Sequence, residues 1–543
     1  MNHKKLGIAL CSIHLVLLTC YAAAPVAAAS PVVPTTWYIN GQPAQSPPEG
    51  SWQDVKKINS CESQPGYQRF TDYPNGYSVC LPSGLQPDFS LSAVRSSFAN
   101  KSTQIEIYHD IFSSEHLGAW EYTVDANVNL LSSKRNRITT RETIDWDGFT
   151  VNRIKWDRAP LTAVPGDRNY YASLELQLLP SEYYTIFIKS SSPITNDLDI
   201  LHSFRWTAPR GAAQIFRKTT PAKAKLNEET RRFVKEHFGP GSSLRWGLFD
   251  YNAPDNLQSV LDLESRLGYK FTFLLRYQSL ADAPPIAGLE NAYTDGRYTE
   301  LSMETTHPEA NNALRFSESQ INREVLYDIL DGKYDSHFRE YAQTLKKFGH
   351  PVLFRFDNEM NGDWCWYSAT FSGKDTDIYK AVWRHVHGLF DEVGVDNVLW
   401  VWNPNDLSFP RFKWNEALMY YPGDDVVDIV GLTGYNTGTY FASDPWREFP
   451  DIYQPLYANY SAWFDKPFII GEFGSNSVGG DKVAWINKMF REMPKFNRIK
   501  VAIWWSGIDW DENGRPGRIY KLDETPATED AFRRGLKNYT TQK

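Results

Sequence analysis

Residues 351–367 read PVLFRFDNEMNGDWCWY, a stretch that joins an apolar run to a cluster of polar and aromatic residues. The run from Pro351 to Phe356 starts with proline and is rich in strand-forming residues, which predicts a buried parallel strand. Polar residues follow at once and place Glu359 at the C-terminal mouth of that strand. A carboxyl group there can protonate a glycosidic oxygen, and nearby rings such as Trp364 can stack on pyranose faces. The stretch therefore indicates a sugar site.

A second stretch repeats this pattern. Residues 466–474 read KPFIIGEFG, an apolar run led by proline that ends in Glu472. A single glutamate after a strand is usually a solvated loop residue or a neighbour of a helix cap, but two strand mouths of one barrel can bring two glutamates together. Retaining glycosidases need two carboxyl groups roughly 5–5.5 Å apart, one as acid and base and the other as nucleophile. We therefore expect Glu359 and Glu472 to form a catalytic pair.

Several motifs that follow one another in order resemble glycoside hydrolase family 26, the β-mannanase family. They are FDNEMNGDWCWY, NVLWVWNPN, YYPGDDVVDIVGLTGYN, KPFIIGEFGSNSVGGDKVAWI and IKVAIWWSGIDWD. The resemblance covers Leu244 to the C-terminus and implies a (β/α)8 barrel, with Glu359 as acid/base after the fourth strand and Glu472 as nucleophile after the seventh. One residue departs from the family pattern, because Asn358 stands where family mannanases usually have histidine.

The resemblance also implies residues that hold the sugar. Tyr435 is expected to hydrogen-bond the nucleophile, and Trp505 is expected to form the floor of the subsite for the scissile sugar; packing between loops is the alternative for both. Asn358 is suited to hydrogen-bond the sugar 2-hydroxyl, and Trp364 to stack on a ring. His307, after the third strand, is expected to contact sugar hydroxyls, although a lone histidine is often structural.

The fold class expected is α/β, a (β/α)8 TIM barrel preceded by a smaller α+β domain. Eight candidate strands alternate with amphipathic helices such as 377–393, whose apolar residues share one face. The strands are 244–251, 271–277, 298–303, 351–356, 397–403, 428–434, 467–471 and 500–505. Roughly 300 residues of this alternation suit one barrel with its active site at the C-terminal strand ends. The barrel domain is predicted over residues 227–543.

The chain begins with a stretch typical of export. A charged start, the apolar run 6–18 and the small residues 27–29 predict a signal peptide over residues 1–29. We therefore expect a secreted, extracellular protein, with cell-wall association as one form of it. Retention as a membrane anchor and lipidation of Cys20 are the alternatives. No later apolar run is long enough to span a bilayer.

Residues 30–206 are predicted to form the ancillary α+β domain with an antiparallel sheet. Short strands are expected at 77–81, 104–108, 126–129, 149–156, 172–179 and 183–189, with a helix at 196–204 that packs across them. No catalytic cluster is visible here, so wall attachment or glycan binding competes with a spacer or stabilising role. The basic stretch 207–226 is the predicted linker. Each domain is expected to have its own apolar core.

Composition limits the possible partners. The net charge is −8 and no basic stripe is present, which disfavours nucleic acid. The 19 Trp and 30 Tyr suit a large aromatic core and stacking on a β-linked polysaccharide or oligosaccharide. The acidic residues lack the spacing of a calcium loop, so neither a metal nor a cofactor is expected, and a monomer is expected. Cys61 and Cys80 are expected to pair in an oxidising compartment, whereas Cys365 is expected to be a small packed residue.

The function predicted is a secreted, retaining endo-β-glycosidase that hydrolyses β-mannan. Asn358 keeps a mixed-linkage β-glucan or a bacterial exopolysaccharide open as the substrate, because its short amide suits an equatorial 2-hydroxyl as well as an axial one. A non-catalytic surface protein that binds glycans is a third possibility, but a pure binder has no need of two converging glutamates.

Overall fold

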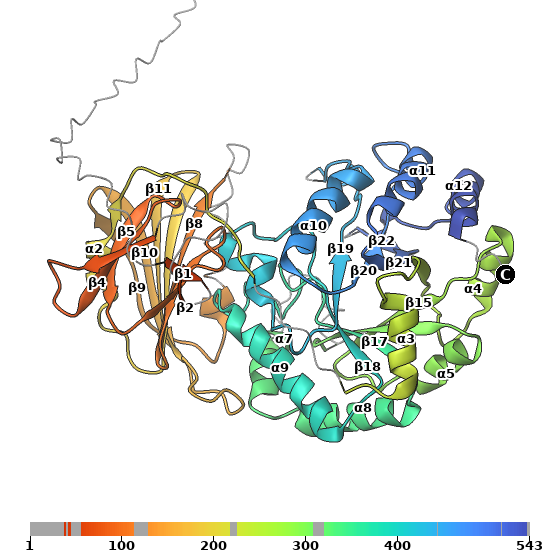
Figure 1. The fold of residues 1–543 in the computed structure, drawn as a ribbon, viewed down its shortest axis with the longest axis horizontal. Coiled ribbons are helices and arrows are strands. Elements are labelled where there is room, and N and C mark those ends of the chain that lie inside the picture. The colour runs from red at the N-terminus through yellow and green to blue at the C-terminus, as the bar shows by residue number, and fades with distance from the viewer. Residues whose placement is uncertain are drawn as a thin grey trace, which may run out of the picture.

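In the computed structural model, two antiparallel sheets stand beside a barrel (Figure 1). The structure describes residues 37–39, 42–44, 56–112, 127, 129–217, 225–307, 320–442, 444–511 and 513–539. The predicted signal peptide lies outside these residues, and so do residues 218–224 of the predicted linker. The domain boundaries at residues 206 and 227 stay predictions.

The barrel consists of parallel strands that close on themselves in chain order. They are β14 (Arg245–Phe249), β15 (Phe273–Ser279), β16 (Tyr298–Glu304), β17 (Val352–Phe356), β18 (Val398–Trp402), β19 (Ile429–Thr433), β20 (Phe468–Phe473) and β21 (Ile499–Trp505). All eight predicted strands are confirmed, with ends that differ by a few residues. β20 runs further than expected, so Glu472 lies inside the strand rather than just after it.

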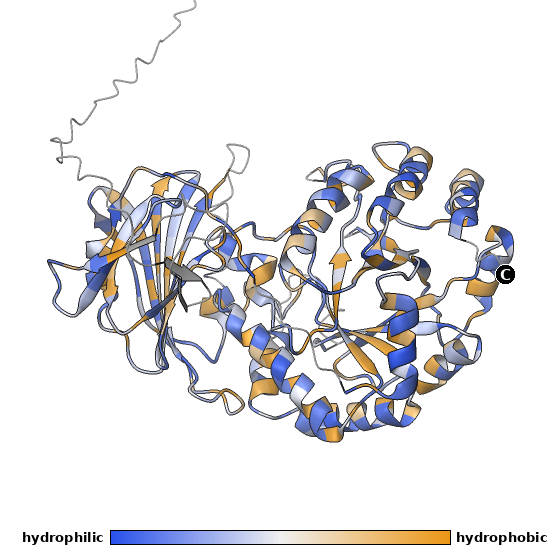
Figure 2. Cartoon of the chain, in the orientation of Figure 1, coloured by the Kyte–Doolittle hydropathy of each residue, from blue (hydrophilic) through white to orange (hydrophobic). Residues whose placement is uncertain are grey.

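Helices surround the barrel and close its floor. They are α3 (Glu228–Phe238), α4 (Gln258–Leu267), α5 (Ile286–Thr294), α7 (Gln320–Leu330), α8 (Asp335–Phe348), α9 (Thr376–Val393), α10 (Phe449–Trp463), α11 (Lys482–Glu492) and α12 (Pro526–Leu536). Phe233 and Phe238 of α3 pack into the apolar interior with strand residues such as Val501. Figure 2 shows apolar strands inside and the mostly hydrophilic surface of α3 outside. Because α3 and its apolar contacts close the floor of the barrel, the polar site lies at the other end, where the strands have their C-termini.

The N-terminal region contains two packed antiparallel sheets and the short hairpin of β1 (Trp37–Ile39) and β2 (Gln42–Ala44). The larger has the order β6 (Gln86–Asp88), β7 (Ser96–Ala99), β8 (Thr103–Ile111), β12 (Glu182–Ser190), β11 (Tyr170–Leu179), β10 (Phe149–Asp157) and β9 (Arg137–Trp146). The smaller has the order β13 (Arg205–Trp206), β5 (Tyr77–Pro82), β4 (Tyr67–Asp72) and β3 (Lys56–Ser60), with α2 (Asp197–Ser203) against β5. The predicted antiparallel sheet and helix are confirmed. The strand predicted at 126–129 is wrong, because residues 129–132 are helical.

The central strands β11 and β12 of the larger sheet bury both of their faces. Along β12, Tyr184, Ile186 and Ile188 pack against the smaller sheet. The alternate residues Tyr183 and Phe187 belong to the same apolar cluster as the barrel. The expectation of two separate apolar cores is therefore only half correct, because successive side chains of a strand point to opposite faces and the second face meets the barrel. In Figure 1, α7 and α9 lie on the barrel side that faces these sheets.

Two smaller expectations are also settled. Cys61 and Cys80 form a disulfide bond, and Cys365 is buried as a free thiol. No helix within the described ranges has the length and apolar character needed to cross a membrane.

Candidate active site

The turn after β17 holds the first of the two predicted catalytic glutamates in an unusual backbone conformation. Asp357 has φ 46° and Glu359 has φ 55°, the left-handed region that non-glycine residues seldom occupy. The buried carboxylate of Asp357 offsets this cost by accepting hydrogen bonds from the Thr305 N–H at 2.7 Å and from its hydroxyl at 2.9 Å. The Glu359 N–H donates to the carbonyl of Asn403 at 2.8 Å. The strained turn is therefore tied to both neighbouring strands.

The carboxyl group of Glu359 has the properties of a proton donor at neutral pH. Burial raises its pKa from 4.5 to about 7, because the charged form loses solvation. The indole N–H of Trp364 donates to it at 3.2 Å and acts in the opposite direction, as does the guanidinium of Arg355. A carboxyl group with a pKa near neutrality can hold its proton and release it within one catalytic cycle.

Glu472 lies in the barrel interior and receives two donors. The hydroxyl of Tyr277 on β15 donates to its carboxylate, and Nη2 of Arg355 on β17 lies 3.4 Å away. Burial, together with the charge of Asp509, raises the pKa of Glu472 to about 8. The hydroxyl and the guanidinium favour the charged form and hold the carboxylate in one orientation. Arg355 thus interacts with both glutamates, because it contacts Glu472 and its charge lowers the pKa of Glu359.

A polar layer lies directly beneath Glu472. Glu300 on β16 is fully buried, and its carboxylate lies 3.7 Å from Nε of Arg355. A side chain at Gly471 would collide with Oδ1 of Asn403, reach Nη1 of Arg355 at 2.9 Å and approach Glu300 at 3.3 Å. Gly471 is therefore required by the close approach of these groups. Burial raises the pKa of Glu300 to about 7, with Arg355 opposing the shift.

Asn358 directly precedes Glu359 and is almost fully buried. Its side-chain oxygen accepts a hydrogen bond from Ser302 at 2.8 Å, and its backbone carbonyl accepts one from Tyr367 at 2.7 Å. Among the described residues, no acceptor bonds its side-chain amide N–H groups. Ser302 also accepts a hydrogen bond from Arg355 at 3.0 Å, so the orientation of the Asn358 amide is linked to the polar layer.

The predicted role of Tyr435 needs correction. The tyrosine that donates to Glu472 is Tyr277, and no hydrogen bond joins Tyr435 to Glu472 within the described part of the chain. The ring of Tyr435 instead packs edge-on to Trp505 at 6.3 Å and tilts against Tyr520 at 4.8 Å. The physical reason is that Tyr277 on β15 reaches Glu472 with its hydroxyl from across the barrel, whereas Tyr435 follows β19. A sugar-binding role for Tyr435 stays a prediction.

Trp364 contacts Glu359, and Trp505 is linked to Glu472 through packed rings. Trp505 ends β21 and stacks on Phe249, with ring centroids 5.1 Å apart and planes within 8°. Phe249 in turn packs on Tyr277 at 5.4 Å, which connects Trp505 to the partner of Glu472. Trp364 is 47% exposed although its indole N–H is bound to Glu359, so its ring is open to a ligand. Both roles stay predictions.

His307 follows β16 and is half-buried. Its Nε2 shares a hydrogen bond with the Tyr334 hydroxyl at 2.9 Å, and its backbone N–H donates to Asn322 at 2.8 Å. These contacts fit a structural histidine. The predicted contact with sugar hydroxyls remains untested.

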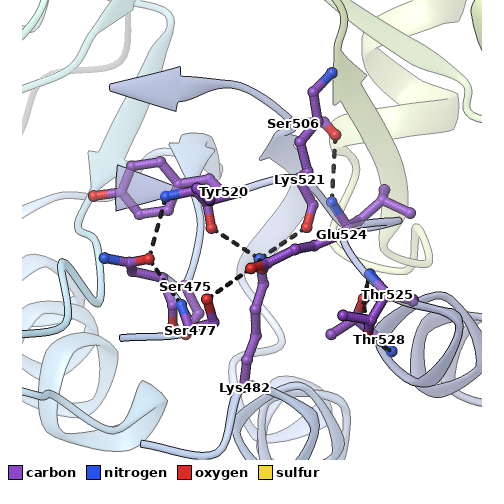
Figure 3. Close-up of polar contacts among 12 residues, drawn as sticks. Ser475, Ser477, Lys482, Ser506, Tyr520, Lys521, Glu524, Thr525 and Thr528 are labelled. Carbon is purple, nitrogen blue, oxygen red and sulfur yellow. Dashed lines mark hydrogen bonds and ion pairs between the residues drawn. The ribbon is translucent and has the colours of Figure 1, made fainter. Parts of the chain in front are cut away.

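The segment that follows Glu472 is held by a buried lysine. Lys482, the first residue of α11, donates to the carbonyls of Ile519 at 2.9 Å and Lys521 at 2.8 Å and pairs with Glu524 at 2.7 Å (Figure 3). Ser477 donates to the same glutamate at 2.7 Å. These bonds fix the segment after β20 to the hairpin of β22 (Ile508–Trp510) and β23 (Pro516–Ile519), which carries Asp509.

Sequence reasoning missed Tyr277, Arg355, Glu300 and Asp509. Two of these residues left a signal, because Arg355 is a charge inside the apolar run of β17, and Tyr277 is the last residue of the predicted strand 271–277. A charged residue in a buried strand must have a partner, which is a reason to look for one. Across the described ranges, no group of three or more His, Cys, Asp and Glu side chains is placed to hold a metal ion.

Comparison with known proteins agrees with this geometry. Residues 297–474 match the profile of glycosyl hydrolase family 26. Endoglucanase H of Acetivibrio thermocellus is 32% identical over 196 residues, which are 35% of this chain and 21% of that protein. Mannan endo-1,4-beta-mannosidase of Bacillus subtilis is 32% identical over 167 residues, 30% of this chain and 41% of that protein. The chain thus spans less than half the length of either relative.

The comparison also found solved structures. The family 26 beta-mannanase from Bacteroides ovatus is 18% identical, with a TM-score of 0.43, over 57% of this chain and 93% of that one. The assignment itself depends on the sequence profile, which spans β16 to β20 and includes both glutamates and Arg355. Residues 297–474 of the barrel are therefore similar in sequence to glycosyl hydrolase family 26.

Proposed function

We propose that this chain is a retaining β-glycosidase that hydrolyses β-mannan at internal bonds. The observation that carries the proposal is the unequal environment of the two glutamates. Glu472 receives donors from Tyr277 and Arg355, which favour and orient a carboxylate. Glu359 instead receives the indole N–H of Trp364 at 3.2 Å. Burial raises the pKa of both carboxyl groups, to about 8 for Glu472 and about 7 for Glu359, so the assignment of roles rests on the donors. Pairs of carboxyl groups whose surroundings separate their roles are the mark of acid/base and nucleophile assignments.

The reaction proposed is a double displacement. The carboxylate of Glu472 attacks the anomeric carbon, the bond to the leaving oxygen breaks, and the proton of Glu359 moves to that oxygen. Glu359, now a carboxylate, then takes a proton from water, whose oxygen attacks the anomeric carbon and releases Glu472. Arg355 and Tyr277 hold the carboxylate of Glu472 in place, and both hydrogen bonds must weaken as its charge passes to the sugar. No cofactor takes part in the proposed steps.

The preference for mannan is supported by the relative from Bacillus subtilis, whose name gives mannan as its substrate. The relative from Acetivibrio thermocellus is named an endoglucanase, which supports a β-glucan as the second candidate. Asn358 is the residue that we infer separates the two. Ser302 occupies its oxygen, so its amide is left to donate to a 2-hydroxyl, which is axial in mannose and equatorial in glucose.

The signal-like start of the chain supports export, and we include a secreted, extracellular location in the proposal, with the cell wall as one site of action. A surface protein that only binds glycans is the alternative of a different class. The donors arranged on Glu472 favour catalysis, because a binding site gains nothing from a buried and oriented carboxylate.

The deciding experiment compares wild type with Glu472→Ala on mannans, mixed-linkage glucans, xylans and bacterial exopolysaccharides. We expect wild type to release reducing ends from mannan and Glu472→Ala to release none. The control Glu340→Ala, an exposed change on α8, is expected to behave as wild type. Equal signals from wild type and Glu472→Ala would mean that the chain is not a hydrolase of this class. A wild type that prefers glucan oligosaccharides, with the preference moving toward mannan in Asn358→His, would remove mannan as the substrate.

A further inference from the structure

The face of the larger N-terminal sheet that meets the barrel carries charged groups. On β11 and β12, alternate side chains point away from the smaller sheet, and among them are Glu175 and Lys189. Lys189 is only 2% exposed, and Glu175 is 5% exposed. Charged side chains are buried in proteins only when they are paired. Each has a partner on the connection between β17 and α9, residues 357–375, which we name the β17–α9 loop.

Lys189 holds the end of this loop and the start of the following helix. Its ammonium group lies 3.1 Å from Asp375, the N-cap of α9, and also pairs with Asp377. Glu106 on β8 completes the cluster at 3.3 Å. Tyr171 on β11 donates to the second oxygen of Asp375 at 3.0 Å. One ammonium group from the N-terminal sheet therefore neutralises carboxylates on both sides of the contact.

The residue before this helix cap is strained. Lys374 has φ 69°, in the left-handed region, and its side chain is only 4% exposed. Its ammonium group pairs with Glu175 and donates to Ser173 at 3.1 Å, both on β11. A bulky residue persists in this conformation only when its surroundings determine it. The surroundings here are the N-terminal sheet, so the strain at the far end of the β17–α9 loop depends on that sheet.

The same sheet also supports the neighbouring connection. The carboxylate of Asp110 on β8 accepts a hydrogen bond from the Lys413 N–H at 2.8 Å, and Phe112 packs edge-on against Phe412 at 5.0 Å. This second connection, which follows β18, is joined to the β17–α9 loop because Asn361 bonds the backbone of Asn405 in both directions, at 2.9 and 3.0 Å. Both connections beside Glu359 are thus docked on the N-terminal sheet.

We propose that the N-terminal sheet is a positioning element of the active site, in which Lys189 and Glu175 hold the β17–α9 loop so that Glu359 is correctly placed for proton transfer. The left-handed turn at Asp357 and Glu359 lies at one end of the loop, and the left-handed Lys374 lies at the other. Releasing the far end lets the loop relax, and the turn that aims Glu359 relaxes with it. The role in catalysis rests on the proposed function, whereas the docking itself does not.

The variants are chosen to separate docking from general stability. Lys189→Met removes the shared ammonium group. Glu175→Gln keeps a hydrogen-bond acceptor for Lys374 but removes the charge, and it is the variant to use if Lys189→Met does not fold. The matched control is Arg153→Met, because Arg153 pairs at 2.6 Å with Asp197 and with Glu142 inside the N-terminal region and contacts no barrel residue among those described.

The first measurement is hydrogen exchange, which needs no activity. In Lys189→Met and Glu175→Gln, amides of residues 361–376 are expected to exchange on the order of 10-fold faster than in wild type, while the strands of the barrel keep their protection. Arg153→Met is expected to leave these amides unchanged. Unchanged exchange in both test variants would overturn the proposal, whether or not the chain hydrolyses a glycan.

The second measurement uses aryl β-mannotriosides with good and poor leaving groups. Misplacement of the proton donor lowers kcat/KM for poor leaving groups, on the order of 10-fold or more, and affects good leaving groups little, because these need little protonation. An equal loss on both substrates, as a general loss of stability would give, would overturn the positioning role. Should wild type cleave neither substrate, the proposed function fails, and the exchange measurement alone decides the docking.

Discussion

At the scale of single residues, Glu472 and Glu359 differ in what surrounds them. Removal of the proposed nucleophile leaves nothing to attack the anomeric carbon, so Glu472→Ala is expected to lose on the order of 10⁴-fold or more in kcat. Glu359→Ala is expected to keep turnover of substrates with good leaving groups, and added azide is expected to give a glycosyl azide of retained configuration. Product analysis by NMR checks this. An azide product of inverted configuration from Glu359→Ala would exchange the two roles.

The indole N–H of Trp364 lowers the pKa of the proposed proton donor, Glu359. Its hydrogen bond to Glu359 lowers the pKa of that carboxyl group against the larger upward effect of burial. Activity requires protonated Glu359 and is expected to fall as the pH rises through about 7. In Trp364→Phe the lowering contact is lost, so the alkaline limb of kcat/KM is expected to move to higher pH. The pH profile checks this, whatever the variant loses in sugar binding, and a limb that moves to lower pH contradicts it.

Tyr277 gives a third test at this scale. Its hydroxyl donates to Glu472, and hydrogen bonds to charged groups contribute about 1.5–3 kcal/mol. Tyr277→Phe keeps the ring that packs on Phe249 and is therefore expected to fold as wild type while kcat falls roughly 10- to 100-fold. Tyr435→Phe is the matched comparison, because the Tyr435 hydroxyl makes no bond to Glu472 within the described residues. An equal fall in both variants would argue against a special role for Tyr277.

At the scale of elements, strand β20 can place Glu472 in the barrel interior only because residue 471 is glycine. A methyl group there would collide with Asn403 and press on Arg355. Gly471→Ala is therefore expected to cost about 1–3 kcal/mol in the free energy of unfolding and to lower kcat by moving Glu472. Gly388→Ala in α9 is the control, because no atom lies within 4 Å of the added methyl group and helices favour alanine. Denaturant unfolding of both variants tests this, and a fully stable Gly471→Ala contradicts it.

At the scale of the whole molecule, the buried carboxyl groups of the barrel link stability to pH. The folded-state pKa of Glu300 is about 7, above its ordinary value of 4.5, so between these two pH values the folded chain holds a proton that the unfolded chain has released. The contribution of protonated Glu300 to the free energy of unfolding is therefore fully present below pH 4.5 and is lost as the pH rises through about 7.

Substitution of Glu300 tests this linkage. Glu300→Gln keeps the shape and cannot ionise, so relative to wild type it is expected to gain up to about 3 kcal/mol between pH 5 and pH 8. Unfolding by denaturant at several pH values measures the gain, with Glu340→Gln on the exposed face of α8 as the control. A Glu300→Gln curve parallel to that of wild type would mean that Glu300 is charged throughout this range.

Local sequence patterns predicted the eight strands, their alternation with helices, and the two glutamates at the C-terminal end of the barrel. These features depend on local patterns, because an apolar run led by proline or a helical periodicity can be recognised from neighbouring residues alone. The sequence also indicated the pairing of Cys61 with Cys80. Only the tertiary structure decided that Tyr277, rather than Tyr435, donates to Glu472 and that Glu300 and Arg355 lie beneath it. It likewise decided that Lys189 docks the N-terminal sheet on the β17–α9 loop. Such contacts join residues 195 and 186 positions apart, and only closure of the barrel and packing of the sheet against it bring them together.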